Sequence, residues 1–264
     1  MALNFFYEKQ SKRFSEDIDF SMADDFSEEE FQNLQKTLEK NFKRIFKREG
    51  FWVFDIKITK KPSKIEKSLE DFWGGYEIEF KVIKAELTNQ MKDNNIERLR
   101  REAISYGISN KRKFTIDISK YEYCDNKELK DLDNYTLYVY LPSLILFEKL
   151  RAICQQTNEY KQIVKSLTIR ERARDFFDIY MIVKNSDEDL MSIENLKILK
   201  PVFDAKKVPL NLIFKIPQYK EIHRQGYPSL KDTIKPGEKL ENFDFYFNFV
   251  IECVCNNLKS LGIK

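Results

Sequence analysis

At residues 15–21 the chain reads Ser-Glu-Asp-Ile-Asp-Phe-Ser, which places two aspartates two positions apart. Successive side chains of a β-strand alternate between its faces, so Asp17 and Asp19 are expected to project together while Ile18 and Phe20 pack beneath the sheet. Two adjacent carboxylates repel each other unless a cation lies between them, and a hard divalent ion such as Mg²⁺ is the usual solution. The stretch therefore predicts a metal site for phosphate chemistry.

A solvated turn is the alternative explanation of these residues. Asp-x-Asp pairs are common in turns, and residues 16–30 hold eight acidic side chains and no basic one, as the start of a helix also does. Short motifs often match by chance, so the choice depends on the rest of the chain.

The composition is that of an ordinary globular protein. Of the 264 residues, 42% are hydrophobic and 34% charged, with seven glycines and seven prolines, which argues against extensive disorder. No apolar run reaches the roughly 18 residues that a membrane span needs, and the N-terminus lacks the apolar core of a signal peptide. We expect a cytoplasmic protein without a membrane partner.

The cysteines and the single histidine exclude several kinds of site. Zinc sites favour Cys-x-x-Cys pairs with histidine partners, whereas Cys124 and Cys154 stand alone and Cys253 and Cys255 are separated by one residue. We therefore expect reduced structural thiols. A mechanism that needs two histidines is excluded, and His223 is predicted to be structural or to lie at the surface.

Charge is unevenly distributed along the chain. Residues 36–67 hold eleven lysines or arginines against four acids, and they follow the acidic stretch at residues 16–30. An acidic metal pocket beside a basic surface suits a polyanionic substrate. Lysines that merely solvate a helix face are the commoner explanation, so charge alone does not decide between the two.

The periodicity predicts strands early in the chain and helices later. Ser27 and Glu30 form a capping box for a helix that ends near Gly50, and Pro142 is typical of the first turn of another. The remaining segments are predicted as strands at 51–59, 76–84, 114–119 and 135–141 and as helices at 96–106, 169–183 and 243–261. This order favours the α+β class, with a mixed β-sheet flanked by helices in a domain at 1–185 and a smaller helical domain at 186–264.

Asp117 supplies a third carboxylate on a predicted strand. Its neighbours Ile116 and Ile118 belong to the opposite face, so the aspartate is expected to point outward. A sheet that brings Asp117 beside Asp17 and Asp19 would supply enough carboxylates for two Mg²⁺ ions roughly 4 Å apart. A solvated acid on a half-buried strand is the alternative.

Four segments together resemble the AbiEii/AbiGii-type nucleotidyltransferase toxins, a branch of the polymerase-β-like nucleotidyltransferase superfamily. They occur in the family's order between residue 1 and about residue 180, which is more specific than any single match. The segments read Arg13-Phe14-Ser15-Glu16-Asp17-Ile18-Asp19-Phe20-Ser21, Ile116-Asp117-Ile118, Glu148-Lys149-Leu150-Arg151-Ala152 and Arg174-Asp175-Phe176-Phe177-Asp178.

The resemblance implies a nucleotidyltransferase-like fold and a set of site residues. It implies that the metals are bound by Asp17, Asp19 and Asp117, and that the catalytic set also contains Lys149 and Asp178. It further implies that Ser15, Lys149 and Asp175 contact the nucleotide. A lysine ammonium can neutralise triphosphate charge, and aspartates three apart share one side of a helix. A structural salt bridge between the two helices explains Lys149, Asp175 and Asp178 equally well.

One part of the family pattern has no counterpart here. The family places Gly-Gly-Ser or Gly-Gly-Thr just before the segment that matches Ala2-Leu3-Asn4, and in this sequence Met1 stands there. Glycines at that position let backbone N–H groups cradle a phosphate. We therefore expect the first strand and its turn to be missing and nucleotide binding to be weakened or lost.

The leading hypothesis is a Mg²⁺-dependent nucleotidyltransferase that moves a nucleoside monophosphate from an NTP to an acceptor. By resemblance, the acceptor is RNA such as a tRNA end, the role is that of a toxin in a toxin–antitoxin or abortive-infection system, and the protein partner is an antitoxin. A degenerate member of the family that works as a nucleic-acid- or protein-binding module is the main alternative. A metal-dependent nuclease is a third hypothesis, although it has no need of Lys149.

Overall fold

The protein consists of two compact units. Unit 1 contains Met1–Ser15 and Glu122–Lys264, and unit 2 contains Glu16–Tyr121. The structure, a computed structural model, describes residues 12–14, 18–90, 95–107, 110–132 and 135–263. The domain boundary predicted at residue 185 falls at the end of a helix within unit 1 and stays a prediction.

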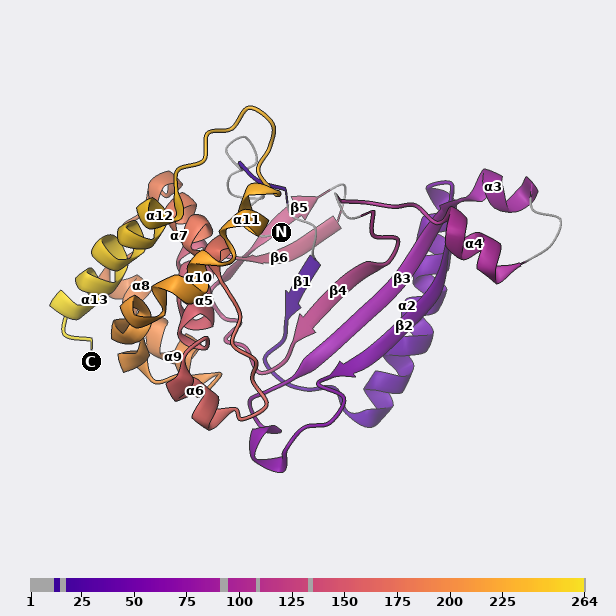
Figure 1. The fold of residues 1–264 in the computed structure, drawn as a ribbon. Helices are drawn as coiled ribbons and strands as arrows, with labels where there is room; N and C mark the ends of the chain where they lie inside the picture. The colour runs from indigo at the N-terminus through magenta and orange to yellow at the C-terminus, as the bar shows by residue number, and fades with distance from the viewer. Residues whose placement is uncertain (1–11, 15–17, 91–94, 108–109, 133–134, 264) are drawn as a thin grey trace. The chain divides into compact units, whose positions relative to one another are not determined.

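Unit 2 is built on a four-stranded mixed sheet (Figure 1). The strand order is β1 (Ile18–Ser21), β4 (Phe114–Ser119), β3 (Gly75–Lys84), β2 (Phe51–Lys61). The β1–β4 pair is parallel, whereas β4–β3 and β3–β2 are antiparallel. Segments distant in sequence, β1 and β4, therefore lie side by side.

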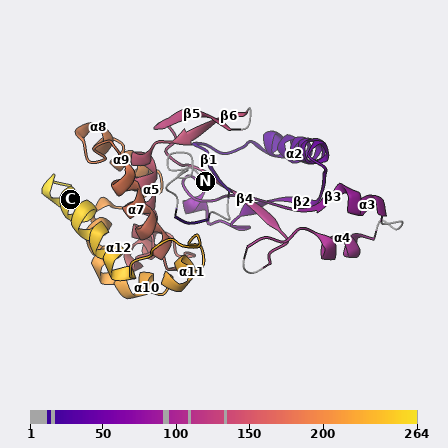
Figure 2. The same cartoon turned by 90° about the horizontal axis from the view of Figure 1, so that it is seen from above.

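Helix α2 (Glu28–Arg48) covers one face of this sheet, as Figure 2 shows. Its start is fixed by the predicted capping box: the Glu30 N–H donates to Ser27 Oγ at 3.2 Å, and the Ser27 N–H donates to Glu30 Oε2 at 2.8 Å. Its apolar stripe packs on a buried cluster made of alternate strand residues, Val53, Ile58, Tyr76, Ile78, Phe80 and Val82. The burial of this apolar surface holds the helix on the sheet.

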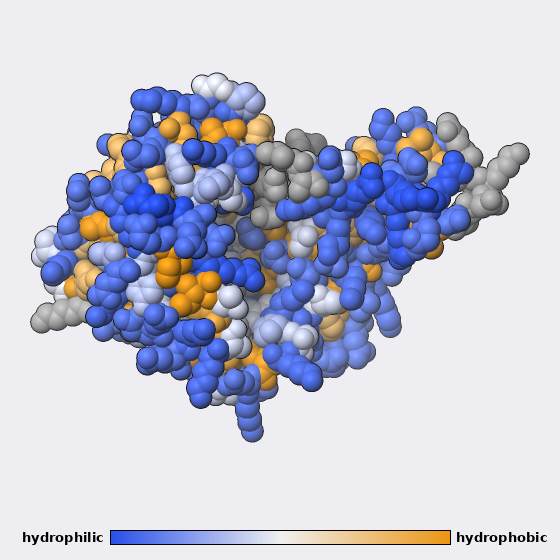
Figure 3. Space-filling view, in the orientation of Figure 1, coloured by the Kyte–Doolittle hydropathy of each residue, from blue (hydrophilic) through white to orange (hydrophobic). Residues whose placement is uncertain are grey.

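The opposite face of the sheet is apolar only at one end. There Phe54 and Ile83 are covered by Leu87 and Leu99, which come from the short helices α3 (Ala85–Gln90) and α4 (Ile96–Glu102). The remainder of this face carries polar side chains, and Figure 3 shows mainly hydrophilic residues over these strands. A polar sheet face is the place where substrate-binding side chains can project.

Unit 1 is mainly helical. Helix α5 packs against α7 and α9, and α12 packs against α7 around the buried ring of Phe176. A hairpin of β5 and β6 precedes α5. The elements of unit 1 are β5 (Lys127–Leu132), β6 (Tyr135–Tyr140), α5 (Pro142–Cys154), α6 (Asn158–Ile163), α7 (Ala173–Asn185), α8 (Ile193–Leu196), α9 (Leu199–Asp204), a 3₁₀ helix (Leu210–Tyr219), α10 (Lys220–Arg224), α11 (Tyr227–Lys231), α12 (Phe243–Val250), a π-helical turn (Ile251–Cys255) and α13 (Asn256–Ser260).

The predicted α+β class and mixed sheet flanked by helices are confirmed, while several details differ. Strand β5 was not predicted, because its sequence Lys-Glu-Leu-Lys-Asp-Leu is mostly charged and is ordered by pairing with β6. Phe20 does not pack beneath the sheet: it is 52% exposed, since β1 is an edge strand and the cluster under α2 does not include it. Helix α7 begins at Ala173 rather than at residue 169, and α4 ends at Glu102.

None of the helices in the described ranges combines the length and the apolar composition that crossing a membrane requires.

Candidate active site

Asp19 and Asp117 lie side by side on the polar face of the unit 2 sheet. The parallel register of β1 and β4 pairs their Cα atoms, which places neighbouring strand positions about 5 Å apart. Both side chains are exposed, whereas Ile116 and Ile118 contact the core on the α2 side. Two of the three predicted metal ligands are thus brought together, while Asp17 and Ser15 lie outside the described residues.

Glu77 extends this row of carboxylates and was missed from the sequence. The antiparallel register of β3 and β4 pairs it with Asp117, and Lys61 Nζ lies 2.8 Å from Glu77 Oε1. The hydrogen bond to Glu77 raises the pKa of Lys61, and the carboxylates of Glu79 and Asp117 add to this effect. Alternation along β3, where Glu77 lies between the buried Tyr76 and Ile78, was the signal available in the sequence.

The donor set at Asp19 and Asp117 fits magnesium. Carboxylate oxygens are hard ligands, and Mg²⁺ is typically bound through one or two carboxylates together with substrate phosphates. In the part of the chain that the structure describes, no three His, Cys, Asp or Glu side chains are grouped so that they could hold a metal. With a metal bound, the pair would supply only part of the coordination sphere, and phosphate and water oxygens would have to supply the rest.

A second charged cluster lies within unit 1, where α5 packs against α7. Lys149 Nζ donates to Asp178 Oδ2 at 2.7 Å and to Asp175 Oδ1 at 3.1 Å. The two aspartates are three residues apart on α7, so both point toward α5. This interhelical ion pair is the arrangement that the structural explanation of these residues predicted, and their role in nucleotide binding stays a prediction.

Arg13 also belongs to this cluster, as does Arg172, whose Nη1 lies 3.6 Å from Asp175 Oδ2; neither was predicted as a site residue. Arg13 Nε donates to Asp178 Oδ1 at 2.7 Å and its Nη2 to Asp178 Oδ2 at 2.6 Å, a bidentate pair. Burial would raise the pKa of Asp178, but the cations Lys149 and Arg13 outweigh it and hold that pKa well below its usual range. Burial likewise opposes the charge of Lys149, yet Asp178 and Asp175 raise the pKa of its ammonium. Asp178 and Lys149 are therefore both ionised at neutral pH.

His223 is buried within unit 1 and is structural, one of the two predicted alternatives. Its ring lies 5.2 Å from the ring of Phe176, and its two nitrogens have no hydrogen-bond partner among the residues that the structure describes. Burial lowers the pKa of His223 to about 4, so the imidazole is neutral at pH 7. The four cysteines are free thiols, as expected.

A buried ionic network lies next to Lys149 on α5. Arg151 Nη2 donates to Glu122 Oε2 at 2.9 Å, Lys206 Nζ lies 3.2 Å from Glu122 Oε1, and Arg151 lies 3.8 Å from Glu148. Burial raises the pKa of Glu148 to about 7, although the nearby Arg151 cation lowers it. The network therefore contains one carboxyl group that titrates near neutral pH.

Glu148→Gln is expected to remove a pH dependence of stability. The folded protein binds the Glu148 proton up to a pKa of about 7, whereas the unfolded chain releases it near 4.5. Stability from this group is thus complete below pH 4.5 and is lost as pH rises to 7, by about 3 kcal/mol from the difference between those pKa values. Urea unfolding of both proteins between pH 4.5 and 8 measures this. Equal slopes of free energy of unfolding against pH would contradict the assignment.

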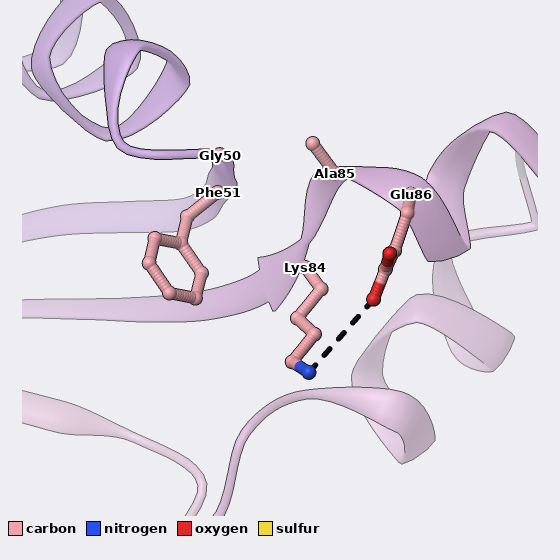
Figure 4. A pocket seen from close by; sticks show the side chains of 5 residues that line it. All are labelled: Gly50, Phe51, Lys84, Ala85 and Glu86. Carbon is pink, nitrogen blue, oxygen red and sulfur yellow. Dashed lines mark ion pairs between the residues drawn. The ribbon is translucent and has the colours of Figure 1, made fainter.

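The structure also has an open pocket at the far end of the unit 2 sheet (Figure 4). Its lining is Gly50, Phe51, Lys84, Ala85 and Glu86, with Lys84 Nζ 3.8 Å from Glu86 Oε1. Lys84 is seven residues along β3 from Glu77, which corresponds to about 23 Å. This pocket is therefore separate from the pair Asp19 and Asp117.

A comparison with models of known protein families identifies the family of this chain. The family model described as "Nucleotidyl transferase AbiEii toxin, Type IV TA system" matches residues 1–249. The chain belongs to the AbiEii family. The resemblance expected from the four sequence segments is thereby confirmed, and the family is one of nucleotidyltransferase toxins from type IV toxin–antitoxin systems. A search of curated proteins gave no match.

Proposed function

We propose that this AbiEii-family protein transfers a nucleoside monophosphate from an NTP to an acceptor hydroxyl and releases pyrophosphate. The observation that carries the proposal is the pairing of Asp19 with Asp117 on the polar face of a sheet. A cation between two adjacent carboxylates relieves their mutual repulsion, and phosphoryl transfer is the chemistry for which such metal-binding pairs are typical.

Each residue of the site has a definite task in this proposal. Asp19 and Asp117 would hold Mg²⁺, with Asp17 as a third ligand, and Glu77 lies at the neighbouring position on β3 and adds negative charge. Bound Mg²⁺ would activate the attacking hydroxyl and neutralise the triphosphate. The family-based assignment gives Lys149 contacts to phosphate oxygens, and within unit 1 Asp178 accepts a hydrogen bond from its ammonium and favours the protonated form. Ser15 and Asp175 contact the nucleotide in the family-based assignment.

RNA, such as a tRNA end, is the acceptor that the charge distribution supports best. Exposed lysines and arginines occur between Lys40 and Lys67. Those of α2 lie on the sheet face opposite to Asp19 and Asp117, whereas Lys57 and Lys61 of β2 share the polar face with the two aspartates. Basic side chains contact phosphates without reading sequence, and such binding weakens steeply with salt. The antitoxin of the same system is the proposed protein partner.

A binding module without catalysis is the second candidate, and one observation favours it. Both Asp175 and Asp178 already engage Lys149, so its charge is largely neutralised in the free protein. A triphosphate would then have to compete with two carboxylates for one ammonium.

One assay separates the candidates. Purified protein is incubated with each NTP radiolabelled at the α-phosphate, MgCl₂ and total RNA, with EDTA as the control. We expect label in RNA and release of pyrophosphate, both abolished by EDTA, because charge neutralisation at Asp19 and Asp117 depends on the metal. Shortened RNA without label would indicate a nuclease. RNA that is retained on a filter but neither labelled nor cut would indicate a binding module.

A further inference from the structure

The segment Lys12–Phe14 is held against the C-terminal part of unit 1. The Phe14 N–H donates to the Thr233 carbonyl at 2.8 Å, and the Lys235 N–H donates to the Lys12 carbonyl at 2.8 Å. These bonds form an antiparallel bridge between Arg13 and Ile234. The bridge fixes the backbone of Arg13, although this residue lies far in sequence from the helices that it contacts.

The bridge places the Arg13 guanidinium beside Asp178 of α7. The side chain is only 20% exposed and makes the bidentate pair with Asp178, which is itself 2% exposed. A planar guanidinium fixes the orientation of a carboxylate more strictly than an ammonium does. The orientation of the Asp178 carboxylate is thus set by a residue outside the helical core.

Arg13 and Lys149 share one oxygen of this carboxylate. Asp178 Oδ2 accepts from Arg13 at 2.6 Å and from Lys149 at 2.7 Å, while Oδ1 accepts from Arg13. Asp178 therefore cannot turn both oxygens toward Lys149. The ammonium has three N–H groups, and its bonds to Asp178 and Asp175 use two of them.

We propose that Arg13 is a positioning residue for nucleotidyl transfer: by holding Asp178 in a bidentate pair, it keeps the Lys149 ammonium available to the triphosphate. This inference rests on the proposed function. Without Arg13, both oxygens of the buried Asp178 carboxylate could accept hydrogen bonds from Lys149. The ammonium would then be held more tightly and would be less able to contact phosphate. Arg13 acts through Asp178 and need not touch the nucleotide itself.

The test compares Arg13→Gln and Arg13→Lys with the wild type. Two quantities are measured on full-length protein: the KM for NTP in the transfer assay, and the acetylation rate of Lys149 against pH, read by mass spectrometry of its peptide. Removing Arg13 deletes a neighbouring positive charge and frees Asp178 for Lys149, so we expect roughly tenfold slower acetylation at fixed pH, equivalent to about one pH unit in the profile. The KM for NTP should rise roughly tenfold with a smaller change in kcat.

Arg13→Lys keeps the positive charge but not the bidentate geometry. We expect its Lys149 acetylation rate to be close to that of the wild type, while its KM for NTP stays closer to that of Arg13→Gln. Arg224→Gln is the matched control, because Arg224 makes a bidentate pair with Asp244 at 2.6 and 2.9 Å elsewhere in unit 1. Arg224→Gln should leave both the pH profile of Lys149 acetylation and the KM for NTP unchanged. Arg13→Lys also keeps the test decisive if Arg13→Gln does not fold.

The outcomes separate this inference from the proposed function. Folded Arg13 variants with a wild-type acetylation profile and a wild-type KM would overturn the positioning role and leave Arg13 as a purely structural ion pair. If the wild type shows no transfer under any condition, the proposed function fails, whereas a shifted acetylation profile still supports control of Lys149 by Arg13. A shift of equal size in Arg224→Gln would overturn the inference as well.

Discussion

Asp117→Asn is expected to lower kcat/KM for nucleotidyl transfer roughly a thousandfold while leaving the fold intact. The substitution keeps the shape of the side chain but removes one charge of the pair formed with Asp19 across β1 and β4. Since Asp117 is exposed on the polar face, its amide does not disturb the cluster under α2. Initial rates at saturating Mg²⁺ measure the effect, and thermal unfolding of the same samples checks the fold.

Asp71→Asn is the matched control for this substitution. Asp71 is an exposed aspartate of the same unit, in the turn before β3. The same chemical change there should leave the rate within about twofold, because a lone surface charge contributes little. If Asp117→Asn were as active as Asp71→Asn, then Asp117 would not be part of a metal site and the proposed function would lose its main support.

Gly75→Ala is expected to destabilise the protein by more than about 4 kcal/mol, the range of severe core lesions. A Cβ added at Gly75 would lie 2.1 Å from the backbone carbonyl oxygen of Ile118 and 3.3 Å from the Cα of Ser119. Backbone atoms of a paired strand cannot move aside without breaking the β3–β4 ladder, in which Gly75 is the partner of Ser119. Urea denaturation monitored by circular dichroism measures the loss.

Gly50→Ala serves as the comparison for the glycine substitution. Gly50 has φ +80 and no atom within 4 Å of an added Cβ, so alanine there adds only the strain of a left-handed conformation, about 1 to 2 kcal/mol. The two variants therefore separate backbone collision from backbone strain. A Gly75→Ala protein as stable as Gly50→Ala would show that β3 and β4 do not pair in this register.

Local patterns were sufficient for much of the fold. The capping box at Ser27 and the apolar stripe that follows it predicted α2, and alternation predicted β2, β3 and β4 with Asp117 turned away from its isoleucine neighbours. These signals are short-range, because helix and strand periodicity depends on residues within a few positions. Strand β5 was not predicted, because its charged sequence has no strand-like alternation and the strand forms by pairing with β6.

The candidate site could be predicted only in part. Asp19 and Asp117 were expected to meet, yet nothing in either segment indicated that β1 and β4 are parallel neighbours or that Glu77 follows them across the sheet. Strand order and register are set by pairing between distant segments, which one-dimensional alternation does not encode. The resemblance to the family supplied the expectation that the aspartates belong together.

The amino-acid sequence was enough to predict the family and the α+β class and to name the carboxylates of the candidate site, because these depend on composition, periodicity and short motifs. Which charges meet was decided by tertiary structure. Arg13 reaches Asp178 across 165 positions, and Lys206 joins Glu122 across 84, through backbone pairing and helix packing. Such contacts form where folding brings buried charges together, since a buried ion is stable only beside an opposite charge.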